Sequence, residues 1–249
     1  MSQLSAIVIT RNEAANIGAC LDGLAFCDER IVVDCGSTDA TVEIARRKGA
    51  RVEFHEWRGF GPQKNYALSL ATGNWVLSID ADERVTHELA AAIKTAIGGD
   101  GADAWEFPRL SSFCGRQIRH SGWYPDYVLR LFRRGTARFD DVIVHERVIC
   151  KGVVKRLRQP LLHHPVLKLE DALSRMDRYS TAKAQMIVAS GRKVSFLSGV
   201  GHGLFSFLRT YVLRAGFLDG AEGFLLAVAN AEGSYYPYMK AWLATRQCK

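Results

Sequence analysis

Two periodicities alternate along the first hundred residues, and this alternation restricts the fold more than any other feature of the sequence. Short apolar runs of strand length occupy residues 6–9, 31–33, 52–54 and 75–79. Between them, apolar residues recur every three or four positions, which is the spacing of one helical face. This order of strands and helices predicts an α/β fold with a mostly parallel sheet that carries helices on both faces.

Helix start and stop signals support this prediction. Helices are expected to begin near residues 13, 37–39, 62 and 86. Asp39 and Thr86 are the expected N-caps of the second and fourth helix, because a short oxygen-bearing side chain accepts hydrogen bonds from the first N–H groups of a helix. Gly49 and Gly98 stand where the same two helices are expected to end, since glycine readily follows a helix C-terminus.

The pattern changes after about residue 102. An added, partly antiparallel layer is predicted from short extended pieces at 104–107, 127–132 and 142–149. A long helix is predicted beyond Pro165 from apolar residues at helical spacing, namely Leu169, Leu173, Met176 and Tyr179. Residues 166–249 are therefore expected to form a C-terminal helical extension.

The charge of the 249 residues is unevenly distributed. Residues 1–150 hold 18 Lys and Arg against 20 Asp and Glu, a net charge of −2, whereas residues 151–249 hold 15 against 6, a net charge of +9. A basic tail suits nucleic acid, an anionic membrane or a phosphorylated substrate. No nucleic-acid partner is expected, because the aromatic residues of the tail follow an apolar helical stripe instead of alternating with a basic face.

Six cysteines are spread along the chain without a CxxC pair or a spacing typical of metal sites. A disulfide framework or a zinc site is therefore not expected, and a reducing cytosol is the favoured compartment. The first predicted strand follows the N-terminus almost at once, so no signal peptide is expected. The sequence has no uninterrupted apolar run of the roughly 18 residues that a spanning helix needs.

Acidic residues follow the fourth predicted strand in the stretch LSIDADERV, residues 77–85. Asp80 and Asp82 lie at the carboxyl end of that strand, the edge at which parallel α/β sheets bind ligands. Two unpaired carboxylates repel each other, whereas a bound Mg²⁺ or Mn²⁺ removes the repulsion and bridges to substrate phosphates. The alternative is a pair of solvated turn or helix-capping residues.

Further polar residues stand at the same predicted edge. Asp34 ends the second strand and can accept hydrogen bonds from a nucleobase or a sugar hydroxyl, while Gly36 lets the backbone approach a ligand closely. Arg11 and Lys64 are the cations nearest these loops in chain order, and they suit a diphosphate. The alternatives are an Asp34 that caps the following helix and a solvated Lys64.

The motifs ITRNEAANI, IVVDCGSTDAT, Lys64-Asn65 and LSIDADERV, in this order, resemble the nucleotide-sugar-binding half of family 2 glycosyltransferases. With HSGWYPDYVLRLFRR, FDDVIVHERV and YVLRAGFLDGAEGF, they are most similar to lipopolysaccharide core β-1,4-glucosyltransferases of Gram-negative bacteria. The resemblance implies a Rossmann-like GT-A fold, a UDP-sugar donor, Mg²⁺ or Mn²⁺ and an inverting displacement. It also implies a catalytic domain over residues 1–165, with a nucleotide-binding half (1–100) and an acceptor half (101–165).

The resemblance implies roles for individual residues. The residues expected to bind the donor are Thr10, Arg11, Glu13, Asp34, Gly36, Lys64, Asp80, Ala81 and Asp82. Within this set, Thr10 and Glu13 are expected to line the uridine site and Asp34 to contact uracil. Asp80 is expected to meet the ribose or the metal ion, and Asp82 to be the main metal ligand.

Inverting transfer needs a base that takes the proton from the acceptor hydroxyl, on the side opposite the leaving group. The candidates are Glu146 in VHERV, which is slightly favoured, and Asp126 in WYPDY. His145, next to Glu146, is a candidate ligand for the metal ion or for a phosphate oxygen. The alternative for Glu146 is an ion pair with an arginine such as Arg130.

Two further histidines, His163 and His164, are adjacent in the sequence. Adjacent residues of an extended strand point to opposite sides, so the two imidazoles are not expected to share a metal ion. Both are predicted to be mainly structural.

The basic tail contains an amphipathic stretch over residues 203–218. One predicted helical stripe, interrupted by Arg209 and Arg214, consists of Phe205, Leu208, Val212 and Ala215. Such a helix can lie in a membrane interface, with its arginines at anionic headgroups. The alternative is a helix packed on the domain with its arginines extended to water. Membrane docking is favoured, because the stripe coincides with the basic tail.

The expected function is transfer of a hexose, with glucose favoured, from a UDP-sugar to the heptose region of the lipopolysaccharide inner core. The acceptor would be lipid-linked, and the protein would be cytoplasmic and peripheral on the inner face of the inner membrane. The alternatives are another lipid-linked or surface glycan as acceptor, a sugar-phosphate nucleotidyltransferase, and a non-catalytic membrane adaptor. The nucleotidyltransferase is disfavoured, because TRNEAAN stands where a glycine-rich basic loop is expected.

Overall fold

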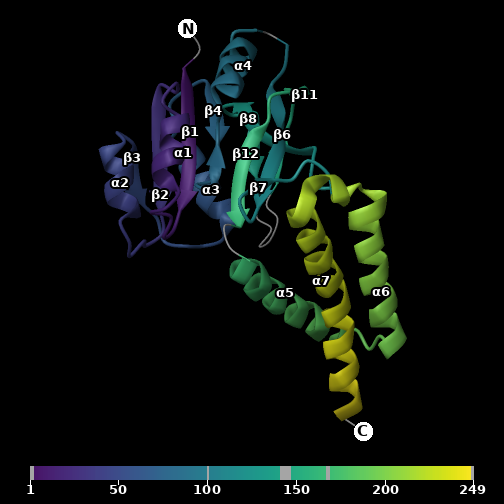
Figure 1. The fold of residues 1–249 in the computed structure, drawn as a ribbon. Coiled ribbons are helices and arrows are strands. Elements are labelled where there is room, and N and C mark those ends of the chain that lie inside the picture. Colours follow the sequence, from purple (N-terminus) through teal and green to yellow (C-terminus); the bar gives the residue numbers. More distant parts are fainter. Residues whose placement is uncertain (1–2, 100, 141–146, 167–168, 248–249) are drawn as a thin grey trace. The chain divides into compact units, whose positions relative to one another are not determined.

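The computed structural model describes residues 3–99, 101–140, 147–166 and 169–247. The chain divides into two compact units, which we describe separately (Figure 1). Unit 1 comprises Met1–Arg109 and Asp126–His163, and unit 2 comprises Leu110–Pro125 and His164–Lys249. The second junction lies close to the boundary predicted after residue 165. Residues 110–125 group with the C-terminal helices instead of with the predicted acceptor half.

Four parallel strands form the first part of the sheet in unit 1. They are β1 (Leu4–Thr10), β2 (Glu29–Asp34), β3 (Arg51–Phe54) and β4 (Trp75–Ser78). Their order in the sheet is β3-β2-β1-β4, and each neighbouring pair runs parallel. The parallel α/β sheet predicted from the sequence is therefore confirmed.

Helices cover both faces of this sheet. They are α1 (Ile17–Gly23), α2 (Thr41–Arg47), α3 (Phe60–Leu70) and α4 (His87–Ile97). Residues of α1, α2 and α4 share one apolar cluster with Ala6 and Val8 of β1, whereas Ala67 of α3 shares a second cluster with Ile7. Successive side chains of β1 thus enter opposite cores, which explains why the buried strands are apolar throughout.

The ends of two helices test the predicted caps. At α4, the Thr86 hydroxyl accepts a hydrogen bond from the N–H of Leu89 at 3.2 Å, and Gly98 follows the last turn, as predicted. At α2, the N-cap position is occupied by Ala40 and not by Asp39. Asp39 Oδ1 instead accepts a hydrogen bond at 3.0 Å from the N–H of Thr41, the first residue of α2. Asp39 therefore still satisfies a donor at the start of the helix.

Mostly antiparallel strands extend the sheet, as predicted. Strand β8 (Asp126–Arg133) runs antiparallel to β4, and β6 (Ala104–Phe113) runs antiparallel to β8. Strand β12 (Leu161–Val166) pairs antiparallel with the short β5 (Glu83–Arg84) and sets His163 opposite Glu83. Both β6 and β12 continue into unit 2.

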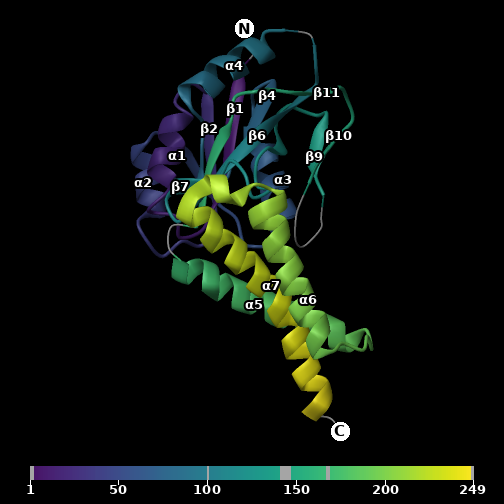
Figure 2. The ribbon, with the colours of Figure 1, turned by 45° about the vertical axis from the view of Figure 1, so that its right-hand side comes forward.

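Three short strands complete the β-structure. Strand β11 (Val154–Arg156) lies parallel to β6, and in unit 2 β7 (Arg116–Gln117) pairs antiparallel with the end of β6. Strands β9 (Ala137–Phe139) and β10 (Val148–Cys150) form a separate antiparallel ribbon (Figure 2). Of the piece predicted at 142–149, residues 142–146 lie outside the described residues.

Unit 2 is mainly helical. Its helices are α5 (Leu169–Ala189), α6 (Phe196–Leu208), the π-helical turn η1 (Arg209–Leu213), the 3₁₀ turn η2 (Gly216–Asp219) and α7 (Gly220–Gln247). Helices α5 and α6 both pack on α7. Glycine permits the close approach of α6, because a Cβ at Gly203 would lie 3.1 Å from Cβ of Tyr235. No described helix is both long enough and apolar enough to span a bilayer.

The predicted long helix after Pro165 is confirmed as α5, but its apolar stripe is not its buried face. Leu173 and Tyr179 are exposed, whereas Ser180, Ala184 and Ile187 are buried. The small residues of α5 face α7, because they allow the two helix backbones to approach.

Candidate functional site

A cavity of about 440 Å³ lies in unit 1 at the carboxyl ends of the parallel strands. Its walls come from the loops after β1, β2 and β4, from the start of α3 and from β12. The lining residues are Ile9, Thr10, Arg11, Glu13, Cys35, Trp57, Phe60, Gln63, Lys64, Asp80, Ala81, Asp82 and His163. The volume is typical of small-molecule sites, and the position is the one predicted for a ligand of a parallel sheet.

Most of the predicted donor-binding residues meet in this cavity. Those among its lining residues are Thr10, Arg11, Glu13, Lys64, Asp80, Ala81 and Asp82. Asp34 and Gly36 are not lining residues, although Cys35 between them is. The buried Asp34 carboxylate accepts hydrogen bonds from the N–H groups of Gly36 and Ser37, both at 2.8 Å, and thereby shapes the loop after β2. Its contact with uracil stays a prediction.

Two buried cations hold Asp80. Lys64 Nζ lies 2.8 Å from Asp80 Oδ1, and Arg130 Nη2 pairs with Asp80 Oδ2. Burial by itself raises the pKa of Asp80, but the charges of Arg130 and Lys64 outweigh it and hold this pKa well below its usual range. Both carboxylate oxygens are engaged inside the protein, and the contact of Asp80 with the ribose or the metal ion stays a prediction.

Arg130 also connects Asp80 to a second buried acid. Its Nη2 lies 2.6 Å from Glu83 Oε1, and Glu83 Oε2 accepts a hydrogen bond from the N–H of Asp80 at 3.0 Å. Glu83 is fully buried, and this burial raises its pKa, with Arg130 opposing the shift and Asp80 adding to it. The described acidic partners of Arg130 are thus Asp80 and Glu83. Glu146, which was paired with an arginine such as Arg130 only in the alternative, lies outside the described residues.

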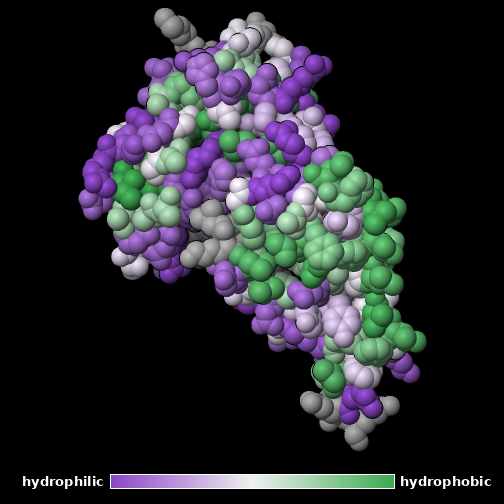
Figure 3. Space-filling view, viewed as in Figure 1, coloured by the Kyte–Doolittle hydropathy of each residue, from purple (hydrophilic) through white to green (hydrophobic). Residues whose placement is uncertain are grey.

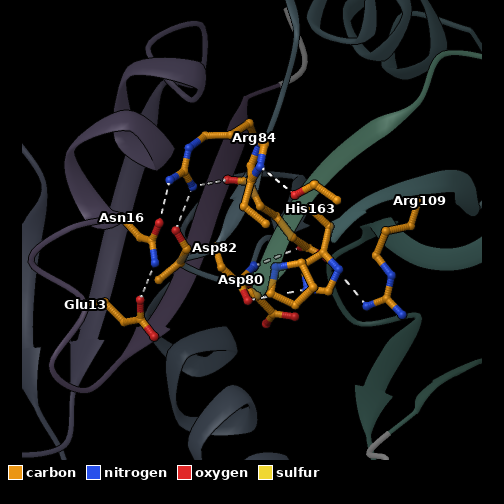
Figure 4. Close-up of polar contacts among 12 residues, drawn as sticks. Glu13, Asn16, Asp80, Asp82, Arg84, Arg109 and His163 are labelled. Atoms are coloured by element: carbon orange, nitrogen blue, oxygen red, sulfur yellow. Dashed lines mark hydrogen bonds and ion pairs between the residues drawn. The ribbon is translucent and has the colours of Figure 1, made fainter. Parts of the chain in front are cut away.

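Asp82, the second acid of the DAD motif, also lines the cavity. Unlike Asp80, it is not paired with a buried cation among the described residues. Its Oδ2 lies 3.3 Å from His163 Nε2 (Figure 4). Burial raises the pKa of Asp82, but the hydrogen bond and charge of His163 reverse the effect and lower it. Asp82 and His163 therefore present one carboxylate and one imidazole side by side on the cavity wall.

His163 and His164 point to different partners, as their adjacency predicted. His164 Nδ1 lies 3.0 Å from Ser112 Oγ within unit 2. His163, in contrast, lines the cavity, so the expectation of a mainly structural role misses its position at the site. No local sequence signal distinguishes the two histidines, because the β12–β5 register alone brings His163 to Asp82.

The side chains of this site suit a metal ion that binds together with a phosphate-bearing ligand. Within the described ranges, no group of three or more His, Cys, Asp or Glu side chains is arranged to hold a metal ion. His145 lies outside these ranges. Mg²⁺ in nucleotide sites commonly takes one or two carboxylates together with substrate phosphates, and keeps several waters. Asp82, with His163 beside it, matches this smaller set.

A line of hydrogen bonds joins two walls of the cavity (Figure 4). Asn16 donates to Glu13 Oε2 at 2.9 Å and accepts from Arg84 Nη2 at 3.0 Å. Arg84 in turn donates to the carbonyl of Ala81 at 2.8 Å. Asn16 and Arg84, which the sequence analysis did not identify, thus fix the loop after β1 against the loop after β4.

The cavity wall also carries an unsatisfied hydroxyl. Thr10 Oγ1 is buried and has no hydrogen-bond partner among the described residues. Buried polar groups are usually paired, and an exception is a common sign of a missing ligand group or water. This observation favours a polar ligand next to β1.

Asp126 lies outside the cavity lining and in an ion pair. Its Oδ2 accepts from Arg109 Nη2 at 2.6 Å and from Arg109 Nε at 3.0 Å, and about half of the side chain, 47%, is exposed. Arg109 also lies 3.9 Å from Glu83 Oε1, at the outer end of the buried charge network. Whether Asp126 or Glu146 is the base stays a prediction, because Glu146 is not among the described residues.

The parallel sheet, its antiparallel addition and the acidic motif after β4 define a GT-A fold of the kind that glycosyltransferases use. The model of the family described as Glycosyl transferase family 2 matches residues 5–158, and the chain belongs to this family. The protein is therefore a glycosyltransferase.

Two curated relatives match almost the whole chain. The chain is 32% identical over 251 residues to the lipopolysaccharide core biosynthesis glycosyltransferase LpsC of Rhizobium meliloti (strain 1021), covering 96% of this chain and 90% of the relative. It is 30% identical over 244 residues to the uncharacterized glycosyltransferase RP128 of Rickettsia prowazekii (strain Madrid E), covering 93% of this chain and 84% of the relative.

Solved structures match more distantly. Glucosyl-3-phosphoglycerate synthase from Mycobacterium tuberculosis, in complex with Mn²⁺, UDP and glucosyl-3-phosphoglycerate, aligns with a TM-score of 0.37 and 28% identity over 46% of this chain and 45% of that chain. S. aureus TarS aligns with a TM-score of 0.46 and 19% identity over 74% of this chain and 40% of that chain. The chain thus covers less than half of each of these two proteins.

Proposed function

We propose that this glycosyltransferase moves a hexose, with glucose as the first choice, from a UDP-sugar to the heptose region of the lipopolysaccharide inner core. The observation that supports the UDP-sugar site is the cavity at the ends of β1 and β4, whose lining includes Asp82 and His163. The acceptor half is supported by the similarity to LpsC over 90% of that protein's length.

In the proposed donor complex, Asp82 and His163 would hold Mg²⁺ or Mn²⁺, which would supply positive charge beside the diphosphate leaving group. Thr10 and Glu13 line the uridine, and Asp34 contacts uracil. Lys64 keeps Asp80 ionised and in place. The displacement is inverting, with the acceptor hydroxyl opposite the diphosphate.

A donor screen tests the proposal most directly. The purified protein, with Mn²⁺, is incubated with a panel of UDP-sugars, and UDP release is measured with and without a truncated lipopolysaccharide core acceptor. We expect release to require the heptose-containing acceptor and to be fastest with UDP-glucose. Release that depends on a different lipid-linked glycan would keep the enzyme class and replace the acceptor.

The base is tested by neutral substitutions at both candidates. Glu146→Gln should preserve metal-dependent UDP-sugar binding but lower the transfer rate by about 10²-fold or more, the usual contribution of a general base. Asp126→Asn breaks the pair with Arg109 and should have the smaller effect on transfer. Single-turnover rates at saturating donor separate the two. A near-normal rate for Glu146→Gln with a strongly reduced rate for Asp126→Asn would assign the base to Asp126.

We further propose that the protein works as a peripheral protein on the cytoplasmic side of an anionic membrane, where a lipid-linked acceptor is presented. Unit 2 carries an exposed apolar surface, here called the hairpin face, which consists of Leu204, Phe205, Leu208, Val212, Leu213, Phe217 and Leu218. Hydrophobic side chains gather along α6 in Figure 3. Extended exposed apolar surface of this kind is typical of membrane or partner contacts.

The hairpin face differs in one respect from the predicted stripe. Phe205, Leu208 and Val212 are exposed on α6 and η1, which supports the proposed membrane docking. Ala215 is not on the stripe, because the helix ends at Leu213 and Ala215 takes a left-handed backbone conformation with φ of 52°. Arg209 is exposed beside the remaining stripe.

Two double variants with the same two types of substitution, at different places in unit 2, test membrane contact. Arg209→Glu with Leu213→Ser should lower the fraction of protein that sediments with phosphatidylglycerol-containing vesicles, because it removes one cation and one of the most exposed leucines of the hairpin face. The control, Arg246→Glu with Leu243→Ser near the end of α7, should sediment like the wild type. Equal loss in both double variants would argue against a specific hairpin face.

A further inference from the structure

A second cavity, of about 560 Å³, lies entirely within unit 2. Its walls are formed by α5, α7 and the segment that contains β7. The lining residues are Phe113, Trp123, Pro165, Ala172, Arg175, Met176, Tyr179, Ser180, Lys183, Leu226, Ala229, Asn230, Gly233 and Ser234. None of these residues lines the cavity of unit 1, so the two cavities can be tested independently.

The inner wall is apolar. Phe113 and Leu226 are buried in one apolar cluster with Trp123 and Ala172 packed against them. The rings of Phe113 and Trp123 meet edge to face, with centroids 6.0 Å apart. Such a wall stabilises an apolar ligand group by removing both surfaces from water.

Small residues on α7 leave the cavity open. At Gly233, an added Cβ would have Met176 Cγ as its nearest neighbour at 3.8 Å, which is an ordinary contact distance. Gly203 differs, because its Cβ would lie 3.1 Å from Tyr235 Cβ in the tight α6–α7 contact. Glycine at 233 is therefore not required by helix packing, and a larger side chain at this lining position would extend into the cavity.

Two polar side chains of the wall, those of Ser180 and Asn230, already have partners. The Ser180 hydroxyl donates to the carbonyl of Asp177 at 2.9 Å and lies 2.8 Å from Lys240 Nζ. Asn230 Nδ2 lies 3.4 Å from Thr210 Oγ1, and its backbone carbonyl accepts from Ser206 at 3.0 Å. A sugar or a nucleotide needs several directed hydrogen bonds. This wall offers few, which favours a hydrocarbon ligand.

The charged lining residues are both cations. Arg175 and Lys183 lie two turns apart on α5, on either side of Tyr179, and the lining includes no carboxylate. Among the described residues, neither cation has an acidic partner within ion-pair distance, and Arg175 makes a hydrogen bond to the carbonyl of Pro165 at 3.2 Å. An apolar interior with two available cations matches a ligand that joins a hydrocarbon chain to an anionic group.

We propose that this cavity binds one acyl chain of an anionic phospholipid, with the phosphate at Arg175 and Lys183. The proposal concerns unit 2 alone and does not depend on the identity of the sugar donor or acceptor. It differs from the contact of the hairpin face with a bilayer, because the cavity selects one lipid molecule by its headgroup charge.

The test uses monomeric lysophosphatidylglycerol, which has one acyl chain and one phosphate, titrated below its micellar concentration into the full-length protein. Isothermal titration calorimetry should give about one site per chain. Lysophosphatidylcholine with the same acyl chain should bind about tenfold or more weakly, because its headgroup carries no net negative charge. Equal affinity for both lipids would overturn the assignment of the phosphate to the two cations.

Two sets of variants locate the site. Gly233→Leu fills the cavity and should abolish saturable binding of both lipids. Arg175→Gln with Lys183→Gln keeps the apolar interior and should reduce only the affinity for lysophosphatidylglycerol, by about tenfold or more. The matched control, Arg178→Gln with Lys193→Gln, removes two charges outside the lining and should bind like the wild type.

Donor binding provides the internal check. All four proteins should bind UDP-sugar with Mn²⁺ equally well, which would also show that each variant is folded. Unchanged lysophosphatidylglycerol affinity in the charge variant, or in a folded Gly233→Leu protein, would overturn the proposal. Loss of UDP-sugar binding in every protein, including the wild type, would instead contradict the proposed function, and circular dichroism would then show which variants are folded for the lipid comparison.

Discussion

Asp82→Ala is expected to abolish metal-dependent binding of UDP-sugar and to slow hexose transfer strongly. Lys64 and Arg130 hold the carboxylate of Asp80, whereas the carboxylate of Asp82 is not held by either cation. The imidazole of His163 beside Asp82 cannot replace a hard oxygen ligand. Calorimetric titration of UDP-sugar with and without Mn²⁺ measures the effect, and transfer should fall by about 10²-fold or more, as when one electrostatic contact to a leaving group is lost.

Two controls make this result specific. Asp22→Ala removes an exposed acid that pairs with Lys48 away from the cavity, and it should leave donor binding intact. His163→Ala should weaken the response to Mn²⁺ less than Asp82→Ala, because the carboxylate remains. Undiminished metal-dependent affinity in Asp82→Ala would contradict the assignment of the metal ligand.

Arg130→Met is expected to be the most destabilising substitution in unit 1. It leaves Asp80 without one of its two cations and leaves the fully buried Glu83 without the arginine beside it. Removing one partner of a buried ion pair costs about 3–5 kcal/mol, because the remaining charge stays desolvated. Urea denaturation followed by circular dichroism measures the free energy of unfolding.

The comparison variants separate charge from packing. Arg138→Met, on an exposed position of β9, should change the free energy of unfolding by less than about 0.5 kcal/mol. Adding Glu83→Gln to Arg130→Met should recover part of the loss, since it removes the buried negative charge that the arginine balanced. Similar stability of Arg130→Met and Arg138→Met would show that the network contributes little to folding.

The elements that the sequence predicted well depend on local signals. Strands β1 to β4 follow from short apolar runs, and the ends of α4 follow from Thr86 and Gly98, each of which acts on neighbouring residues of the chain. The start of α1 was placed too early, because the N–H groups of Asn16 and Ile17 both bond to the carbonyl of Glu13 in a turn that precedes the helix.

The parts that the sequence did not predict depend on distant pairings. His163 reaches Asp82 because β12 pairs with β5, and Arg130 reaches Asp80 because β8 adds to the edge of β4. A single arginine in the apolar run YVLRLF was the available signal for the second case, since a buried arginine needs acidic partners. Nothing near His163 in the sequence carries comparable information.

The buried ion pairs beside the cavity of unit 1 affect how strongly the protein interior attracts a nucleotide. Lys64 and Arg130 offset Asp80 and Glu83, so this inner layer is close to electroneutral before any ligand enters. A diphosphate that reaches it gains little net attraction from the protein interior. The charge that balances a diphosphate then has to come from outside this inner layer, from Arg11 on the cavity wall and, in the proposed donor complex, from a divalent cation.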